Sequence, residues 1–309
     1  MNHTLLAGAP VAQRPPKGGR LWSLRPGGPW DQGLVEVFTR VVGHALAQRQ
    51  KAHKDPEKAV HEYRKSVRRA RAVVKLVRAP LGERAFLPFN HTLREAVLAT
   101  SGLRDVDVLR RLIQTLAAGS ANMEERELLL RLDQRLSRRQ EVHREGSVGE
   151  ALERGAELLT LLPARFARDL PPLGRAELQE GFAESFRRAK RARRLAREAP
   201  SDEAIHTWRK RVKELRYQLE LDPLADEAPE RAVWAALAES LGEITDRHVL
   251  RRTVVDLRFE LGEQGAVDRL LQALEAGIMA AVAAAFEGSH EAFAPRPRAF
   301  AAGLLDGEA

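Results

Sequence analysis

Cysteine is absent from this chain of 309 residues. Disulfide bonds, thiolate zinc sites and cysteine nucleophiles are therefore excluded. Aromatic residues are also scarce, at 5%, whereas Ala, Leu, Arg and Glu are abundant. This mixture favours helices over sheets, and no segment alternates apolar and polar residues as a half-buried strand would. The composition predicts an all-α fold.

The sequence also lacks a recognisable targeting signal. Its N-terminus, MNHTLLAGAPVAQRPPKGG, has no apolar run of signal-peptide length, and we expect no stretch to span a membrane. With 44% hydrophobic and 30% charged residues, the composition is globular and the chain is long enough to bury a substantial core. We therefore expect a soluble, cytoplasmic protein without membrane contact.

Positive charge is concentrated in a few segments. The chain has a formal net charge of +8, yet residues 61–78, 187–197 and 206–216 together carry +17, so the remainder nets −9. Such segregation is what an anion-binding surface needs. Arg outnumbers Lys 42 to 9, which suits bidentate contacts with phosphate oxygens, although an Arg-rich codon preference explains that ratio equally well.

Capping signals and apolar periodicity divide the chain into helices. Residues 1–30, rich in Pro and Gly, predict a flexible leader, and residues 291–309 predict a loose tail. Asp55 and Ser201 are typical helix starts. Further helices are expected over about 31–54, 84–101, 105–117, 121–145, 149–167, 175–198, 228–242, 246–262 and 264–287.

An internal repeat is the strongest organisational signal. HEYRKSVRRARAVVK from His61 returns as HTWRKRVKELRYQLE from His206, at an offset of 145 residues. Downstream, RDVDVLRR at 104–111 is echoed by TDRHVLRR at 245–252. The repeat predicts two similar halves, at about 31–145 and 175–287, within one domain that covers 31–290.

Helical spacing places the basic residues of each copy on one face. We call these faces the first and second ridges. The first ridge contains His61, Arg64, Lys65, Arg68, Arg71 and Lys75, and the second contains His206, Arg209, Lys210, Lys213 and Arg216. No acidic residue lies on this face of the first copy. A solvated face is the ordinary explanation for a charge run, but the same spacing twice favours anion binding.

A third basic stripe precedes the second copy. It consists of Arg187, Lys190, Arg191 and Arg194. With a short turn, its helix would lie antiparallel beside the second ridge and widen the basic surface. A solvated helix face explains this stripe equally well.

His61 and His206 stand at the head of the two ridges. Neither has another His, Asp or Glu at i+3 or i+4 that would complete a metal pair, and no nucleophile or orienting carboxylate is evident for acid–base catalysis. We interpret them as hydrogen-bond donors to phosphate, with a structural role as the alternative. Neighbouring cations should lower the pKa of each histidine, and a bound polyanion should raise it. Asp105 and Asp246 are interpreted as helix-capping or Arg-pairing residues.

These residues resemble the CHAD family, the conserved histidine α-helical domain. HEYRKSVRRAR with RDVDVL, and HTWRKRVKELRY with ITDRHVL, are similar to the two halves of that domain over about residues 31–290. The resemblance implies two four-helix bundles related by pseudo-twofold symmetry, which bind inorganic polyphosphate through a basic groove or pore, in some members on polyphosphate granules. Ser101 stands where members often have Gly. No E-x-E-x-K motif of a fused triphosphate-tunnel domain occurs, so the resemblance implies a stand-alone member.

The resulting prediction is a polyphosphate-binding protein that needs no cofactor or metal and is not an enzyme. A nucleic-acid-binding module is the first alternative, although base-stacking aromatics are absent from the ridges except for Tyr217. A polyphosphate-metabolising enzyme is the second, and it lacks a candidate carboxylate cluster. A scaffold that docks acidic partners is a third alternative. The oligomeric state stays open.

Overall fold

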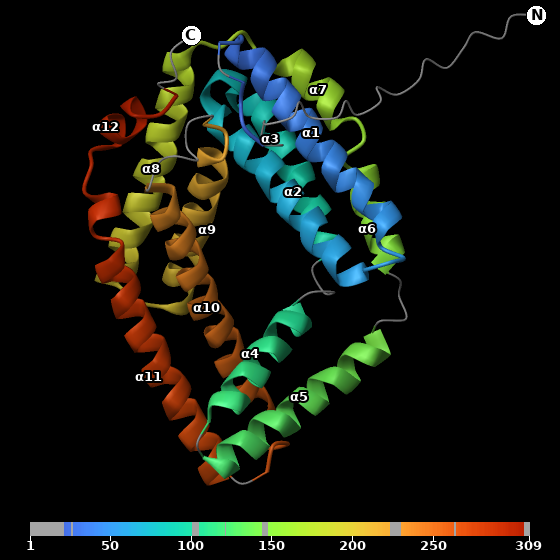
Figure 1. Ribbon diagram of the computed structural model, residues 1–309, viewed down its shortest axis with the longest axis vertical. Helices are drawn as coiled ribbons and strands as arrows, with labels where there is room; N and C mark the ends of the chain where they lie inside the picture. Colours follow the sequence, from blue (N-terminus) through green and yellow to red (C-terminus); the bar gives the residue numbers. More distant parts are fainter. Residues whose placement is uncertain are drawn as a thin grey trace, which may run out of the picture.

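The computed structural model describes residues 22–25, 27–100, 105–120, 122–143, 148–222, 230–262 and 264–305, and this part of the chain is helical, without a strand. The expectation of an all-α fold is confirmed. The helices are α1 (Trp30–Lys51), α2 (Pro56–Leu76), α3 (Arg78–Leu98), α4 (Asp105–Gly119), α5 (Met123–His143), α6 (Val148–Glu157), α7 (Leu162–Asp169), α8 (Arg175–Glu198), α9 (Asp202–Leu219), α10 (Glu230–Leu257), α11 (Gln264–Gly288), the 3-10 turn η2 (Glu291–Phe293) and α12 (Pro297–Ala302) (Figure 1).

Capping chemistry sets the starts of the two helices that carry the ridges. Asp55 is the N-cap residue, directly before α2. Its carboxylate accepts a hydrogen bond from the Lys58 amide at 3.0 Å. The Ser201 hydroxyl accepts from the Ala204 amide at 3.1 Å, one residue before α9. Each cap satisfies an amide that the first helical turn leaves unbonded, so both predicted helix starts are confirmed.

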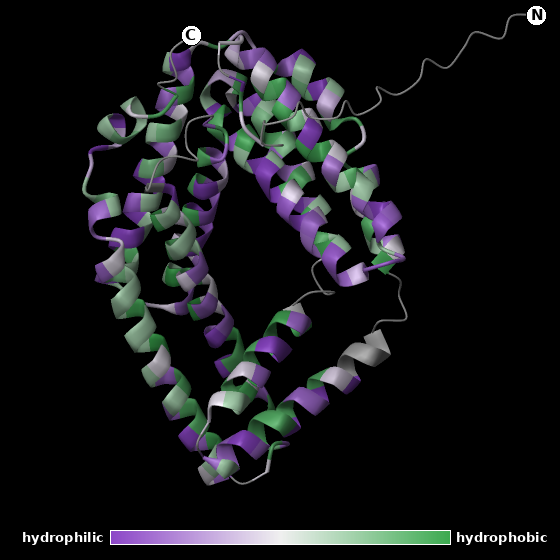
Figure 2. Ribbon diagram, in the orientation of Figure 1, coloured by the Kyte–Doolittle hydropathy of each residue, from purple (hydrophilic) through white to green (hydrophobic). Residues whose placement is uncertain are grey.

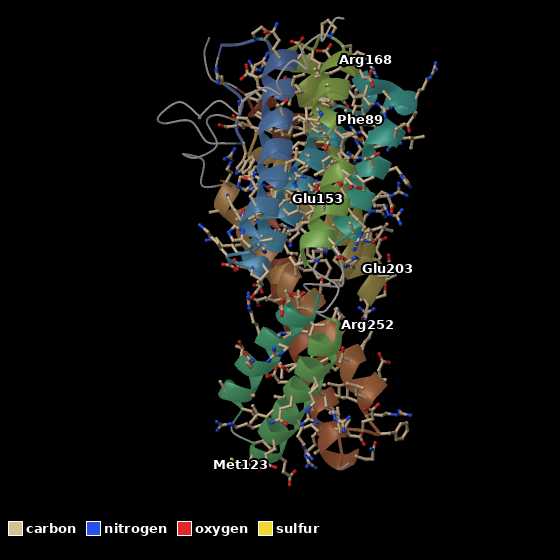
Figure 3. The ribbon with its side chains drawn as sticks, turned by 90° about the vertical axis from the view of Figure 1, so that its right-hand side faces the viewer. Phe89, Met123, Glu153, Arg168, Glu203 and Arg252 are labelled. Carbon is tan, nitrogen blue, oxygen red and sulfur yellow. The ribbon has the colours of Figure 1, made fainter. Side chains whose placement is uncertain are left out.

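The helices pack around two hydrophobic cores. The large core joins α1, α2, α3, α6 and α7 to α8, α9, the first half of α10 and the C-terminal segment. The small core is a separate cluster formed by α4, α5, the second half of α10 and the first half of α11. In Figure 3, Phe89 lies in the large-core region and Met123 at the far end of the small-core bundle. Because each core contains helices from both sequence halves, the halves interlock.

Two predicted boundaries differ from the structure. The helices expected at 228–242 and 246–262 form one continuous helix, α10, although Gly242 lies at the expected break. Gly242 lies beside α9, where a Cβ would be 3.8 Å from the Arg209 side chain, an ordinary contact distance. Conversely, the helix expected over 149–167 is divided into α6 and α7, and the turn between them buries Leu159.

The C-terminal segment is ordered up to Leu305, which corrects the expectation of a loose tail over residues 291–305. Phe300 of α12 stacks on Phe186 of α8 with ring centroids 4.2 Å apart, and Phe293 meets Trp234 edge-on at 5.0 Å. Aromatic burial of this kind outweighs the Pro-rich composition that suggested disorder. Residues 306–309 lie outside the described part of the chain.

The segment before α1 also packs on the domain. The Leu24 amide donates a hydrogen bond to the Leu221 carbonyl at 2.8 Å, and the Leu24 side chain is buried. The Trp22 ring meets His44 of α1 edge-on, with centroids 5.2 Å apart. The last part of the predicted leader is therefore attached to the bundle, whereas residues 1–21 and 26 lie outside the described residues.

α11 corrects the expectation that no stretch could span a membrane. By length and composition it is apolar enough to cross one, since its most apolar window has a mean hydropathy of 1.5, and 22% of that window is buried. In the structure α11 packs through Leu270 and Leu274 into the small core and through Ile278 into the large core.

Replacement of Phe300 by Ala should destabilise the protein by about 2 kcal/mol, because the stack with Phe186 is lost. Denaturant unfolding followed by circular dichroism measures this change. Phe259→Ala is the matched control, since Phe259 is 76% exposed and its removal should change the free energy of unfolding by less than about 0.5 kcal/mol. Equal effects of the two substitutions would show that α12 does not stabilise the fold.

Candidate anion-binding site

α2 and α9, the helices that carry the ridges, contact each other through their C-terminal halves. Gln218 Nε2 donates to the Ala72 carbonyl at 3.0 Å, Arg69 Nε lies 2.5 Å from Glu220 Oε2, and Lys75 Nζ lies 2.5 Å from Glu214 Oε2. Towards their N-terminal ends the two ribbons diverge (Figure 1). Figure 2 shows hydrophilic residues along the sides of α2, α9 and α10 that face one another.

Burial of the opposite faces determines the direction of both ridges. Tyr63, Val67 and Val74 of α2 are fully buried, as are Trp208 and Val212 of α9. Trp208 also stacks on Phe286 of α11, with ring centroids 4.7 Å apart. Burial at these positions agrees with the predicted placement of the basic residues on the opposite face of each helix.

The first ridge has an outward part and a paired part. Lys65 and His61 keep 32% and 42% of their side chains exposed, and both approach Glu62, at 3.9 and 3.8 Å. Arg68 is half-buried. These three residues form the outward part.

The paired part of the first ridge consists of Arg64, Arg71 and Lys75. Arg64 is only 6% exposed and donates to the Val97 carbonyl at 3.3 Å, so it fastens α2 to α3. Arg71 Nε donates to Asn90 Oδ1 at 2.8 Å, and Lys75 pairs with Glu214. The sequence shows no acidic residue on this face of α2 because the carboxylate comes from α9.

Lys210 is the most exposed residue of the second ridge, and the four other members are half-buried. The pKa of His206 is lowered, chiefly by burial and then by Lys210 and Arg209, with Glu203 opposing and Arg252 of α10 adding to the effect. The predicted influence of neighbouring cations is confirmed for His206, although burial is the larger cause. Figure 3 places Glu203 and Arg252 on the same side of the molecule, at the level between the two cores.

Arg252 is a basic residue that the ridge pattern did not include. It is exposed on α10 near His206. The repeat does contain a signal for it, because Arg252 is the last residue of TDRHVLRR and corresponds to Arg111 in RDVDVLRR. Asp246 of the same motif lies inside α10 and does not open a helix, whereas Asp105 starts α4 but its side chain lies outside the described residues.

The third stripe does not widen the second ridge as expected. Arg187 pairs with Glu184 on its own helix, and Arg194 pairs with Glu198 at 3.1 Å. Lys190 donates to the carbonyls of Ala294 and Pro295, at 3.4 and 3.0 Å, so this part of the stripe lies beside the C-terminal segment. Arg191 is exposed. The sequence could not show that the tail occupies this side of α8.

The residues do not assemble a metal centre in the part of the chain that the structure describes, where no group of three or more His, Asp or Glu side chains lies within ligand distance of a common point. What the arrangement offers chemically is positive charge held on rigid helices. Outward amines and guanidiniums on α2, α9 and α10 provide donors for the oxygens of an anion.

The architecture is that of an all-helical domain with two basic helices at its centre. A family model, the CHAD domain, matches residues 36–255. The chain belongs to the CHAD family. The crystal structure of the CHAD domain from the plant Ricinus communis is similar to it, with a TM-score of 0.66, 21% identity, and coverage of 92% of this chain and 99% of that chain. No curated protein matches the chain in sequence.

Proposed function

We propose that this protein binds inorganic polyphosphate through a basic groove between the facing sides of α2, α9 and α10. One observation supports the proposal above all: α2 and α9 are related by the internal repeat, and each keeps cations accessible on the side that faces the other helix. Lys65, Arg68 and Lys210 belong to the two ridges, and Arg252 extends the second. A linear polyanion with about one charge per phosphate matches such a row of cations, as counterion release then drives binding.

We infer further that the two halves are related by a pseudo-twofold repeat. Cross-helix ion pairs support this inference. At the offset of 145, Arg69 of α2 corresponds to Glu214 of α9, and Lys75 corresponds to Glu220, the C-cap residue of α9. Arg69 pairs with Glu220 and Lys75 pairs with Glu214, so the two contacts are exchanged as a twofold axis would exchange them. An interface in which i contacts j and j contacts i is typical of twofold symmetry.

Ion pairs at equivalent positions of the two halves also support the repeat. Arg110 of α4 pairs with Asp133 of α5 at 2.8 Å, and Arg251 of α10 pairs with Glu275 of α11 at 2.7 Å. The offsets between these pairs are 141 and 142 residues. The hairpin α4–α5 thus corresponds to the hairpin α10–α11.

The nucleic-acid alternative is disfavoured by the position of Tyr217. This residue is only 9% exposed, and its ring is covered by Arg69 at 5.6 Å and Arg216 at 6.0 Å. Such a ring is not accessible for stacking on a base, the interaction that single-strand binding requires. We propose a binding protein without catalytic activity, located in the cytoplasm and on polyphosphate granules.

A polyphosphate titration at several salt concentrations tests the proposed function. We expect tight binding at low salt, a steep linear fall of log K with log salt, and little displacement by an excess of single-stranded DNA. A phosphate-release assay with magnesium distinguishes binding from hydrolysis. Displacement by DNA at equal phosphate concentration would favour the nucleic-acid alternative instead.

Bound polyphosphate should raise the pKa of His206. Burial and the cations Lys210 and Arg209 lower this pKa in the free protein, so an anion placed beside them should favour the protonated imidazole. By linkage, affinity should increase as the pH falls through the pKa of His206. NMR titration of the imidazole with and without polyphosphate measures the shift. His290, exposed near the C-terminal segment, is the internal control, and an unshifted His206 at saturation contradicts a ligand at this end of the ridge.

A further inference from the structure

A compact group of cations surrounds the buried carboxylate of Glu214 where α2 meets α9. We call this group the junction cluster. It draws side chains from four helices, namely Arg71 and Lys75 of α2, Arg94 of α3, Arg188 of α8 and Arg211 of α9. A second carboxylate, Glu184, is 46% exposed and lies 3.7 Å from Arg188 at the edge of the cluster, so positive charge still exceeds negative charge there. The cluster is distinct from the outward parts of the ridges, which lie nearer the diverging N-terminal ends of α2 and α9.

Glu214 holds three of the five cations. Its side chain is 6% exposed, and Oε2 lies 2.5 Å from Lys75 Nζ and 3.2 Å from Arg211 Nη1. Oε1 lies 3.5 Å from Arg188 Nη2, which is an ion-pair distance without hydrogen-bond geometry, so this oxygen forms no hydrogen bond within the described residues. One carboxylate thus contacts three cations and cannot neutralise them.

Arg71 and Arg94 complete the cluster from the other side. Arg71 is fixed by Asn90 of α3, and Arg94 lies one helical turn beyond Asn90, on the same side of that helix. Burial lowers the pKa of Arg71, and the charges of Arg94 and Arg211 lower it further while that of Glu214 opposes them, so all three side chains lie within electrostatic reach of Arg71.

Burial and the surrounding cations both act on the pKa values of the central pair. Burial lowers the pKa of Lys75, and the carboxylate of Glu214 only partly opposes this. Burial acts to raise the pKa of Glu214, yet Lys75, Arg188 and Arg211 outweigh it and hold the pKa below its usual value. The cations around Glu214 therefore favour its ionised form, whereas burial is the main cause of the lowered pKa of Lys75 and the charges of Arg71 and Arg211 add to it.

We propose that the junction cluster is a second anion-binding site, which takes a terminal phosphoryl group bearing two negative charges. Arg94 is exposed, and Arg211 is 35% exposed although its Nη1 contacts Glu214, so both side chains are accessible to a ligand from solvent. Arg forks match phosphoryl oxygens bidentately. A terminal phosphoryl group gains its second charge near neutral pH, as phosphoserine does, whereas an internal phosphate of a chain carries one. The site thus favours a chain end or free pyrophosphate over the middle of a chain.

This inference takes its ligand class from the proposed function, but its test is separate. Calorimetric titration with pyrophosphate compares the wild type with the double variant Arg94→Gln/Arg211→Gln. We expect pyrophosphate affinity to fall at least tenfold in the double variant. The control Arg84→Gln/Arg197→Gln removes the same charge at two exposed positions on α3 and α8, and its affinity should stay within twofold of the wild type.

A comparison of linear tripolyphosphate with cyclic trimetaphosphate identifies the recognised group. The cyclic compound has no chain end, so the wild type should bind the linear compound at least tenfold more tightly, and the double variant should lose most of this preference. Free pyrophosphate competing with the linear compound would show that both occupy one site. Equal affinities for the linear and cyclic compounds in the wild type would overturn chain-end recognition.

The two proposals fail in different ways. Loss of long-chain binding in a variant of the outward ridge residues, with pyrophosphate affinity retained, supports both. Unchanged pyrophosphate affinity in Arg94→Gln/Arg211→Gln, or no pyrophosphate binding by the wild type, overturns the junction site and leaves the groove proposal intact. Absence of long-chain binding in the wild type contradicts the groove proposal, whether or not pyrophosphate binds.

Discussion

Polyphosphate affinity should fall by about 10³-fold or more at low salt when four outward cations of the two ridges and α10 are replaced together, because each charge-assisted hydrogen bond contributes about 1.5 kcal/mol. The changes are Lys65→Gln, Arg68→Gln, Lys210→Gln and Arg252→Gln. Removal of four phosphate contacts should also reduce the slope of log K against log salt by about 3. Fluorescence titration with long-chain polyphosphate at three or more salt concentrations measures both quantities.

The choice of these positions follows from burial. Arg64 is conspicuous in the sequence but is nearly buried and bonded to the end of α3, so its replacement would disturb the fold as well as the ligand. Lys65 and Lys210, by contrast, keep their amines accessible. Circular dichroism should show that the quadruple variant retains its helical content.

A matched control distinguishes binding at a specific groove from attraction by the net charge of the protein. It removes four exposed arginines elsewhere on the surface, namely Arg84, Arg126, Arg138 and Arg197. The control lowers the net charge equally, so it should lose only the long-range attraction, about tenfold or less at low salt. If control and quadruple variant lose affinity alike, polyphosphate binds by overall charge and not at the ridges.

Glu214→Gln should destabilise the fold by about 3 kcal/mol in phosphate-free buffer, since removal of one partner leaves buried cations without their counter-charge. Lys75 is 17% exposed and Arg188 19%, so neither is fully solvated in compensation. Denaturant unfolding measures the change. Glu198→Gln removes a carboxylate that is 51% exposed and paired with Arg194, and its effect should stay below about 0.5 kcal/mol.

The same carboxylate predicts how stability depends on pH. The folded pKa of Glu214 lies below its unfolded value of about 4.3, because the surrounding cations outweigh the cost of burial. Its contribution is therefore complete above the unfolded pKa and is lost as the pH falls through the folded pKa. The difference in free energy of unfolding between wild type and Glu214→Gln should shrink below about pH 4. A difference that stays constant down to pH 2 would contradict an ionised Glu214 at the junction.

Local signals in the sequence were sufficient for much of the helical architecture. Asp55 and Ser201 cap the helices that they were predicted to cap, because capping depends only on residues three positions apart. Helical periodicity placed the two ridges on one face of each helix, and Tyr63 and Trp208, on the opposite faces, are fully buried. The repeat located the basic faces, because equal spacing in two copies does not depend on tertiary contacts.

Contacts between distant segments account for the differences. Lys75 and Glu214 are 139 residues apart, so no pattern within either helix indicates that they pair. The break predicted between 242 and 246 is absent because α10 continues through these positions, with Gly242 close to the Arg209 side chain of α9. The C-terminal segment appeared loose because its stability depends on Phe186 and Trp234, which lie on α8 and α10. In each case tertiary packing overrides a local preference.

α10 is one continuous helix that connects the two hydrophobic cores. Its 28 residues extend for about 42 Å, and its two ends are embedded in different cores. α11 runs beside it and is likewise anchored in both. Because these two helices connect the large core to the small core, we expect both cores to unfold in a single cooperative transition. The proposed groove lies between α2, α9 and α10, and because these helices are already held in place, an anion bound there should lose little free energy to reorganisation of the protein.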